Sequence, residues 1–106
     1  MSTHIHHIAI QDDWEMSRGF GAYAVATRGT HLDDEGFIHA TTADRVGQVV
    51  TRRYGDLALP LLDITIDVEH LRSAGVDVGW VDGAPRILGE LPMSSEVIVA
   101  EHPIAR

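Results

Sequence analysis

Residues 35–42 have the sequence EGFIHATT, a short apolar segment that carries His39 and ends in two threonines. Its apolar, β-prone side chains predict a mostly buried strand over residues 37–40. A titratable side chain at that depth needs a hydrogen-bonding partner or a function. Thr41 and Thr42 stand where the next helix is expected to begin. We therefore expect this segment to form one wall of a ligand cleft.

A second histidine, His7, lies in the same kind of context near the N-terminus. Residues 4–10 are rich in apolar and β-branched side chains and predict a first strand. Because side chains alternate along a strand, His7 shares one face with Ile5 and Ala9. If His7 and His39 face one cleft, they can bind ligand hydroxyls, donate to a phosphate or act as a general base. The alternative is that each is a core histidine bonded to a backbone carbonyl.

The bulk composition is that of one globular domain. The 106 residues are 44% hydrophobic, enough for a core and too many for a disordered chain. No apolar run approaches the roughly 20 residues that a membrane-spanning helix needs. The first residues lack the apolar segment of a secretory signal. We therefore expect a single domain over residues 1–106, located in the cytoplasm and without a membrane partner.

The charge balance is acidic, with 16 acidic and 8 basic residues and a formal net charge of −8. Nucleic-acid binding needs a basic face, so we expect no nucleic-acid partner. Lysine and cysteine are absent, which rules out Schiff-base and thiol chemistry on this chain. Arg52 and Arg53 form the pair that can hold a phosphate. The alternative is that they lie on a solvated helix face.

Helix and turn signals organise the first half of the chain. Residues 11–13 are expected to cap a short helix over 14–17, which ends near Gly19. Residues 20–32 show no clear period and predict a loop, with a strand over residues 23–26 as the alternative, and residues 33–36 predict a turn. An amphipathic helix that ends at Gly55 is predicted by apolar residues at spacings of three and four, namely Val46, Val49, Val50 and Tyr54.

The second half alternates short strands with turns. Residues 57–66 form the longest apolar run and predict the central strand, after which Asp67 caps a short helix. Residues 76–81 predict a strand, Asp82-Gly83 a hairpin turn and residues 86–88 the returning strand. Residues 96–100 are the last predicted strand. These elements indicate an α+β domain, with a small split or half-barrel β-sheet and one main helix.

Two further pairs of residues are candidates for binding. His4 and His6 have the i, i+2 spacing with which a strand presents two metal ligands, but no third ligand is evident, so we predict no metal site. Thr41 and Thr42 either cap the helix that follows them or hold an anionic group at its N-terminus.

Several of these segments occur together in a known family. The segments are, in chain order, His6-His7-Ile8, Asp13-Trp14-Glu15, residues 35–42, Arg53-Tyr54, Trp80 and Gly89-x-Leu91-Pro92. Over nearly its whole length the chain thereby resembles the small bacterial proteins of domain-of-unknown-function family 952. The block at residues 35–42 is the specific part of this resemblance.

The resemblance implies an ADP-ribosyltransferase-like fold, in which a split sheet surrounds a cleft for NAD, and a distant similarity to RNA 2′-phosphotransferases. It implies that His7 contacts the adenosine ribose and that His39 packs near nicotinamide. Thr41, Thr42 and Arg53 match the family's Ser-Thr pair and helix arginine. The expected ligand-binding residues are completed by Tyr54, Trp80, Arg86 and Gly89.

The chain departs from the family pattern on its later strands. Trp80-Val81 stands where the family has Trp-Glu, and residues 85–89 (PRILG) stand where it has Pro-His-x-Tyr-Gly. Val81, Arg86 and Leu88 therefore replace an acid, a histidine and a tyrosine. Their replacement favours ligand binding without catalysis.

Three functions agree with the sequence. The first is an enzyme of the ADP-ribosyltransferase-like class that acts on NAD or an ADP-ribose-bearing substrate, with Glu90 as the carboxylate that stabilises an oxocarbenium-like state. The second is a non-catalytic module that binds a nucleotide-like or other small ligand in the same cleft. The third is a different small-molecule enzyme that uses His7 and His39 as acid and base.

Overall fold

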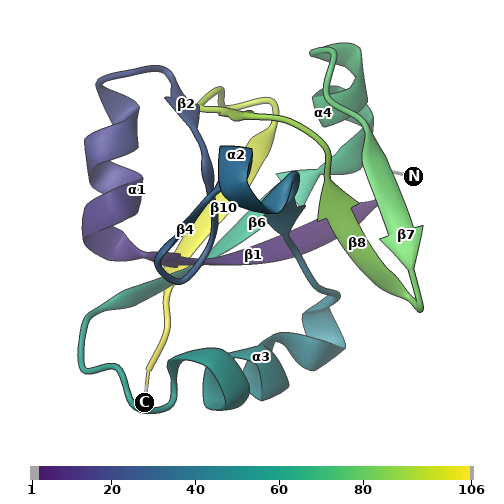
Figure 1. Cartoon of the computed structure of the whole chain (residues 1–106). Coiled ribbons are helices and arrows are strands. Elements are labelled where there is room, and N and C mark those ends of the chain that lie inside the picture. Colours follow the sequence, from purple (N-terminus) through teal and green to yellow (C-terminus); the bar gives the residue numbers. More distant parts are fainter. Residues whose placement is uncertain (1–2, 106) are drawn as a thin grey trace.

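Two small antiparallel sheets form the framework of residues 3–105, the part of the chain that this computed structural model describes. The first has the strand order β1-β6-β10 and the second the order β5-β8-β7. Their strands are β1 (His4–Ile10), β6 (Leu61–Asp67), β10 (Ile98–Pro103), β5 (Ile38–His39), β8 (Ala84–Ile87) and β7 (Val78–Val81). In Figure 1, β7 and β8 run across the direction of β1.

Short helices and two strand pairs connect and cover these sheets. The helices are α1 (Gln11–Arg18), α2 (Leu32–Glu35), the 3₁₀ helix η1 (Ala43–Arg45), α3 (Val46–Tyr54) and α4 (Val68–Ser73). The strand pairs are β2 (Ala22–Tyr23) with β9 (Leu91–Pro92), and β3 (Val25–Thr27) with β4 (Thr30–His31). The predicted α+β class is confirmed. No described helix is long and apolar enough to span a membrane.

Strand β6 is the centre of the larger sheet, as its apolar sequence predicted. It pairs with β1 on one side and β10 on the other, and Ile64 and Ile66 are fully buried. The expected strand over residues 57–66 is wrong in its first four residues, because β6 begins at Leu61. Pro60 precedes it and has no N–H to donate to a sheet ladder, while its carbonyl accepts from the Gln11 N–H at 3.0 Å.

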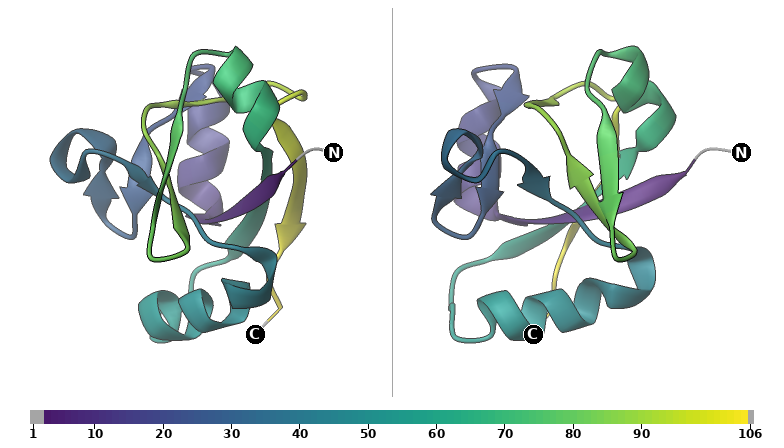
Figure 2. Two further views of the ribbon diagram at one scale, coloured as in Figure 1. Left: turned by 90° about the vertical axis from the view of Figure 1, so that its right-hand side faces the viewer. Right: turned by 45° about the vertical axis from the view of Figure 1, so that its right-hand side comes forward.

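Helix α3 packs against the first sheet through its apolar side. Val50 and Tyr54 are buried against Ile8 and Leu61, and the Tyr54 hydroxyl donates to the Ile8 carbonyl at 3.2 Å. Figure 1 shows α3 below β1, and both views in Figure 2 place it at the bottom of the molecule, away from α1 and α4. The predicted amphipathic helix is confirmed, and it leaves the side of α3 that carries its arginines available to a site.

Three local predictions are wrong in part. Residues 20–32 contain β2, β3 and β4 instead of a loop, and these strands of two or three residues are too short to show a period. Helix α1 begins at Gln11 without a side-chain cap and is nearly as long as α3, so the domain has two main helices. The last strand, β10, lies two residues later than predicted, at Ile98.

Two capping and turn predictions are confirmed. The Asp67 carboxylate accepts from the His70 N–H at 3.0 Å and so caps α4. Asp82 and Gly83 have φ angles of 52° and 79°, the left-handed backbone that a tight two-residue hairpin between β7 and β8 requires. Residues 33–36 reverse the chain as expected, but they do so within the short helix α2, which Gly36 closes at φ 89°.

The buried centre of β6 makes a direct prediction about stability. Replacing Ile64, which is fully buried, by Ala should lower the free energy of unfolding by about 3 kcal/mol, because it removes apolar contacts and leaves a cavity. Urea denaturation followed by circular dichroism measures this loss. Val99→Ala on the exposed side of β10 is the control and should change it by less than about 0.5 kcal/mol. Equal effects of the two substitutions would contradict the assignment of the core.

Candidate functional site

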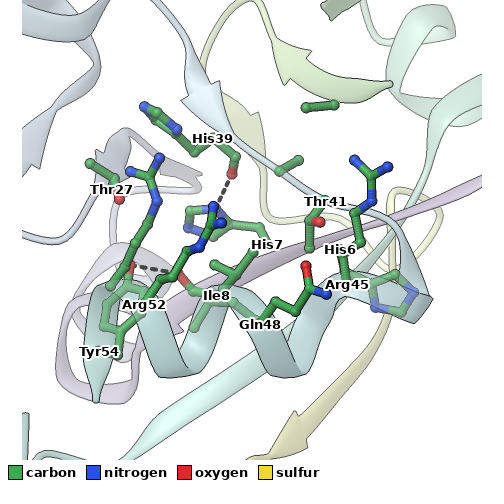
Figure 3. A pocket seen from close by; sticks show the side chains of 14 residues that line it. His6, His7, Ile8, Thr27, His39, Thr41, Arg45, Gln48, Arg52 and Tyr54 are labelled. Carbon is green, nitrogen blue, oxygen red and sulfur yellow. Dashed lines mark hydrogen bonds between the residues drawn. The ribbon is translucent and has the colours of Figure 1, made fainter. Parts of the chain in front are cut away.

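A cavity of about 490 Å³ lies between β1, α3 and the segment from β5 to η1, within the volume range of small-ligand sites. It is lined by His6, His7, Ile8, Thr27, His39, Ala40, Thr41, Arg45, Gln48, Val49, Arg52, Arg53, Tyr54 and Ala84. In Figure 3, His6, Thr41 and Arg45 lie at one end of this cavity, and Thr27, Arg52 and Tyr54 at the other.

The structure brings together half of the residues that the sequence singled out. Those lining the cavity are His7, His39, Thr41, Arg53 and Tyr54. Those outside its lining are Thr42, Trp80, Arg86, Gly89 and Glu90. The two groups separate because β5, β1 and α3 meet at the cavity, whereas most of β7 and β8 and the segment after them do not.

The ring of His7 is buried and both of its nitrogens have partners. Nδ1 lies 2.6 Å from the His39 carbonyl oxygen, and Nε2 lies 2.9 Å from the Tyr23 hydroxyl. A carbonyl can only accept, so Nδ1 carries the proton and Nε2 accepts from Tyr23. Burial lowers the pKa of His7 from 6.5 to about 4, so the ring is neutral at neutral pH. This geometry is that of the core-histidine alternative.

His39 is more accessible than His7. Its Nε2 lies 3.4 Å from a carboxylate oxygen of Glu35, at ion-pair distance but without the alignment of a hydrogen bond. Its ring packs 4.7 Å from the ring of Phe37. Burial lowers the pKa of His39, the positive charge of Arg53 lowers it further, and Glu35 opposes both effects. In Figure 3 the dashed line from the ring of His7 ends on the backbone carbonyl of His39.

Three arginines give the cavity a positive charge. Arg45, Arg52 and Arg53 line it, and none of them forms an ion pair within residues 3–105. The arginines that do pair with carboxylates are Arg18, Arg28 and Arg72. No Asp or Glu appears among the described lining residues. An acidic chain therefore gathers unpaired positive charge at one concave site.

Arg45 was not predicted from the sequence, although a signal for it exists. Arg45 and Arg52 are seven positions apart, which places them two turns apart on one helix face, together with Gln48 and Val49. The apolar period that predicts this helix includes Val49 and gives no information about the arginines beside it. Extending the helix face back into η1 recovers all three arginines.

The two threonines have different roles from those expected. Thr41 is buried and exchanges backbone hydrogen bonds of 2.7 and 2.8 Å with His6, so it joins β1 and does not cap a helix. Thr42 is at the N-cap position of η1, but its side chain does not cap the backbone and instead lies 2.5 Å from an oxygen of Asp44. The expected side-chain cap is therefore wrong at both positions.

The candidates outside the cavity contact other parts of the fold. The Arg86 guanidinium lies 4.3 Å from the centre of the Phe37 ring, a cation–π contact. Trp80 is 46% exposed on β7, and Glu90 is exposed. A side chain at Gly89 would meet Val76 at 3.3 Å, so this glycine allows a close packing contact.

A histidine–carboxylate pair beside the cavity was also missed. His6 Nδ1 lies 2.8 Å from Asp63 Oδ1, and both side chains are largely buried. His6 lines the cavity. The two residues are 57 positions apart, so no local pattern could have joined them. Among the residues described, no three His, Cys, Asp or Glu side chains are grouped so that they could hold a metal ion.

Comparison with known proteins agrees with the family suggested by the sequence. A family model described as a protein of unknown function (DUF952) matches residues 8–98. The chain belongs to this family. The fold is also found in the crystal structure of protein CC0527 from Caulobacter crescentus, with a TM-score of 0.77. The two sequences are 21% identical, and the match covers 97% of this chain and 87% of CC0527.

A second crystal structure, of a double mutant of CC0527, gives a TM-score of 0.76 at 20% identity, with the same coverage. No curated protein matches the chain. At this level of identity the likeness to CC0527 establishes a shared fold.

The buried neutral ring of His7 predicts how stability depends on pH. Because the pKa is about 4 in the folded state and 6.5 for a free ring, the unfolded chain takes up the proton first. The neutral His7 ring therefore contributes about 3 kcal/mol to the free energy of unfolding above pH 6.5. This contribution is lost as the pH falls through 4. Urea denaturation between pH 8 and 4 measures it.

His7→Gln provides the comparison, because glutamine can still donate to the His39 carbonyl but does not titrate. The variant should be less stable at pH 8 and should lose less stability than the wild type on acidification. Parallel curves for the two proteins would show that His7 is not held neutral by burial.

Proposed function

We propose that this protein binds a small phosphorylated ligand of the nucleotide type, NAD or ADP-ribose, in the arginine-lined cavity. The observation that carries the proposal is the set of three arginines without carboxylate partners, Arg45, Arg52 and Arg53, around one cavity of ligand size. An unpaired guanidinium is a fork of donors that matches phosphate oxygens. No lining carboxylate in the described part of the chain competes with an anionic ligand.

The rest of the lining suits the non-phosphate part of such a ligand. Ile8, Val49 and Ala84 provide apolar surface, and Thr27 and Gln48 provide hydrogen-bonding groups. Small-molecule sites typically combine apolar walls with a few convergent polar groups. The buried Tyr54 supports the wall, because its hydroxyl is tied to the backbone of β1.

We also assign the fold to the ADP-ribosyltransferase-like class. Two small antiparallel sheets, joined through β1 and β5, are what supports this assignment. The cavity opens where they meet, which is the place that the family resemblance implies for NAD. Fold alone does not establish chemistry, and the support for the proposed ligand comes from the arginines of the cavity.

Binding is the function that the geometry supports best, ahead of transferase chemistry. His7 has both ring nitrogens engaged within the protein, and Glu90 is exposed and outside the cavity lining. His39 lines the cavity and its side chain is partly exposed, so it remains the candidate for contact with a ligand. Turnover of bound NAD to nicotinamide would move the conclusion to the enzyme alternative.

Isothermal titration calorimetry with ADP-ribose and NAD tests the proposal. The double variant Arg52→Ala/Arg53→Ala should weaken binding by about tenfold or more, because it removes two charge-assisted contacts to phosphate. The affinity of the wild type should fall as salt increases. His39→Ala should also weaken binding.

Arg18→Ala/Arg72→Ala is the matched control, since it removes the same charge from arginines that do not line the cavity and whose exposed ion pairs contribute little. This variant should bind like the wild type. Absence of binding at millimolar ADP-ribose, NAD and pyrophosphate would refute the proposal. So would an equal loss in both double variants.

A further inference from the structure

His6 and Asp63 form a fixed pair at the edge of the cavity. The Nδ1 atom of His6 lies 2.8 Å from Asp63 Oδ1, and the two side chains are 14% and 20% exposed. The backbone of His6 is also held, because it exchanges two hydrogen bonds with Thr41. A side chain that is fixed at both its backbone and one ring nitrogen is pre-organised, which is what a binding group requires.

Asp63 determines which nitrogen of His6 carries the proton. A carboxylate only accepts hydrogen bonds, so Nδ1 carries the hydrogen. In the neutral ring, Nε2 is then an acceptor. This is the arrangement in which a carboxylate orients a histidine toward a hydroxyl group.

The Nε2 atom of His6 is the ring nitrogen of the pair that is left for a ligand. No partner for Nε2 is found in the described structure, and it is not among the buried polar atoms that lack one. His6 lines the cavity while Asp63 does not. Nε2 is therefore the free end of the pair, and a ligand that meets the neutral ring there must supply a hydrogen-bond donor.

The pair lies at the same end of the cavity as Arg45. Thr41 bonds to the His6 backbone, and one residue later the Thr42 carbonyl accepts from the Arg45 N–H at 3.0 Å. Figure 3 shows His6, Thr41 and Arg45 together at this end. The guanidinium of Arg45 forms no ion pair within the described residues. A phosphate group and a hydroxyl group can thus be recognised side by side.

We infer that His6, oriented by Asp63, is a hydroxyl-binding subsite beside Arg45, and that the ligand is a phosphate ester of a polyol, a sugar phosphate. The inference rests on the proposed anion binding and adds the group next to the phosphate. His6 is the residue that touches the ligand, and Asp63 is a positioning residue. The pair needs no metal ion and no second chain for this role.

Ribose 5-phosphate and methyl phosphate separate the two parts of the site. Both are phosphate monoesters, and only the first carries further hydroxyls. NMR titration of the wild type should show ribose 5-phosphate binding about fivefold tighter, the value of one neutral hydrogen bond. His6→Ala should lower the ribose 5-phosphate affinity to that of methyl phosphate. His4→Ala, on the same strand and outside the cavity lining, should bind ribose 5-phosphate more tightly than methyl phosphate by the same factor as the wild type.

Asp63→Asn tests the positioning role without changing side-chain size. The amide can donate to Nδ1, which would move the ring proton of His6 to Nε2 and turn the acceptor into a donor. Nitrogen-15 NMR of the histidine rings should show the Nδ1–H form in the wild type and more of the Nε2–H form in the variant. The preference for ribose 5-phosphate should change with it, because the ligand hydroxyl would then have to accept from Nε2–H instead of donating to Nε2. A purely structural role would leave that preference unchanged.

The outcomes separate this inference from the proposed function. If ADP-ribose and pyrophosphate bind but ribose 5-phosphate and methyl phosphate bind equally in the wild type, the hydroxyl subsite is refuted and anion binding stands. If His6→Ala still prefers ribose 5-phosphate over methyl phosphate, the hydroxyl subsite is also refuted. If His6→Ala weakens both esters equally, His6 is a phosphate ligand and the assignment is overturned. If no phosphate compound binds the wild type, both conclusions fail.

Discussion

The buried ring of His7 is the contact on which the rest of the site depends. Its two hydrogen bonds connect β1 to the backbone of β5 and to the Tyr23 hydroxyl on β2. They hold one sheet against the other at the place where the cavity opens. Burial lowers the pKa of His7 and raises that of Tyr23, so both remain neutral and the bonds keep their direction. The residues that follow β5 are then fixed as a wall of the cavity.

The fold could be predicted where the signal is local. The apolar run of β6, the helical period of α3, the Asp67 cap and the Asp82-Gly83 turn each lie within a few residues of sequence. The bounds and partners of strands β2 to β4 could not be found in this way. Tyr23 pairs with Leu91 across 68 positions, and a strand of two residues has no period of its own. Its structure is set by its distant partner.

The site was predicted in its residue types but less well in their roles. His6 and His7 are neighbours whose side chains point to opposite faces of β1. The apolar surroundings of His7 identified it as buried, but only the distant Tyr23 shows that its nitrogens are engaged. His6 gained its place in the site from Asp63, which lies 57 positions further along the chain. The local sequence thus predicts which side chain is buried, but it does not predict which ring nitrogen is left without a partner.

The charge distribution favours the proposed small ligand over a polyanion. The chain has a net charge of −8, yet three unpaired arginines lie at one cavity. In physiological salt, charges more than about 8 Å away are largely screened, so a small anion inside the cavity responds mainly to the arginines. A long nucleic acid would also contact other parts of a chain whose net charge is negative. Local attraction on a chain of negative net charge would thus select the proposed ligand by size as well as by charge.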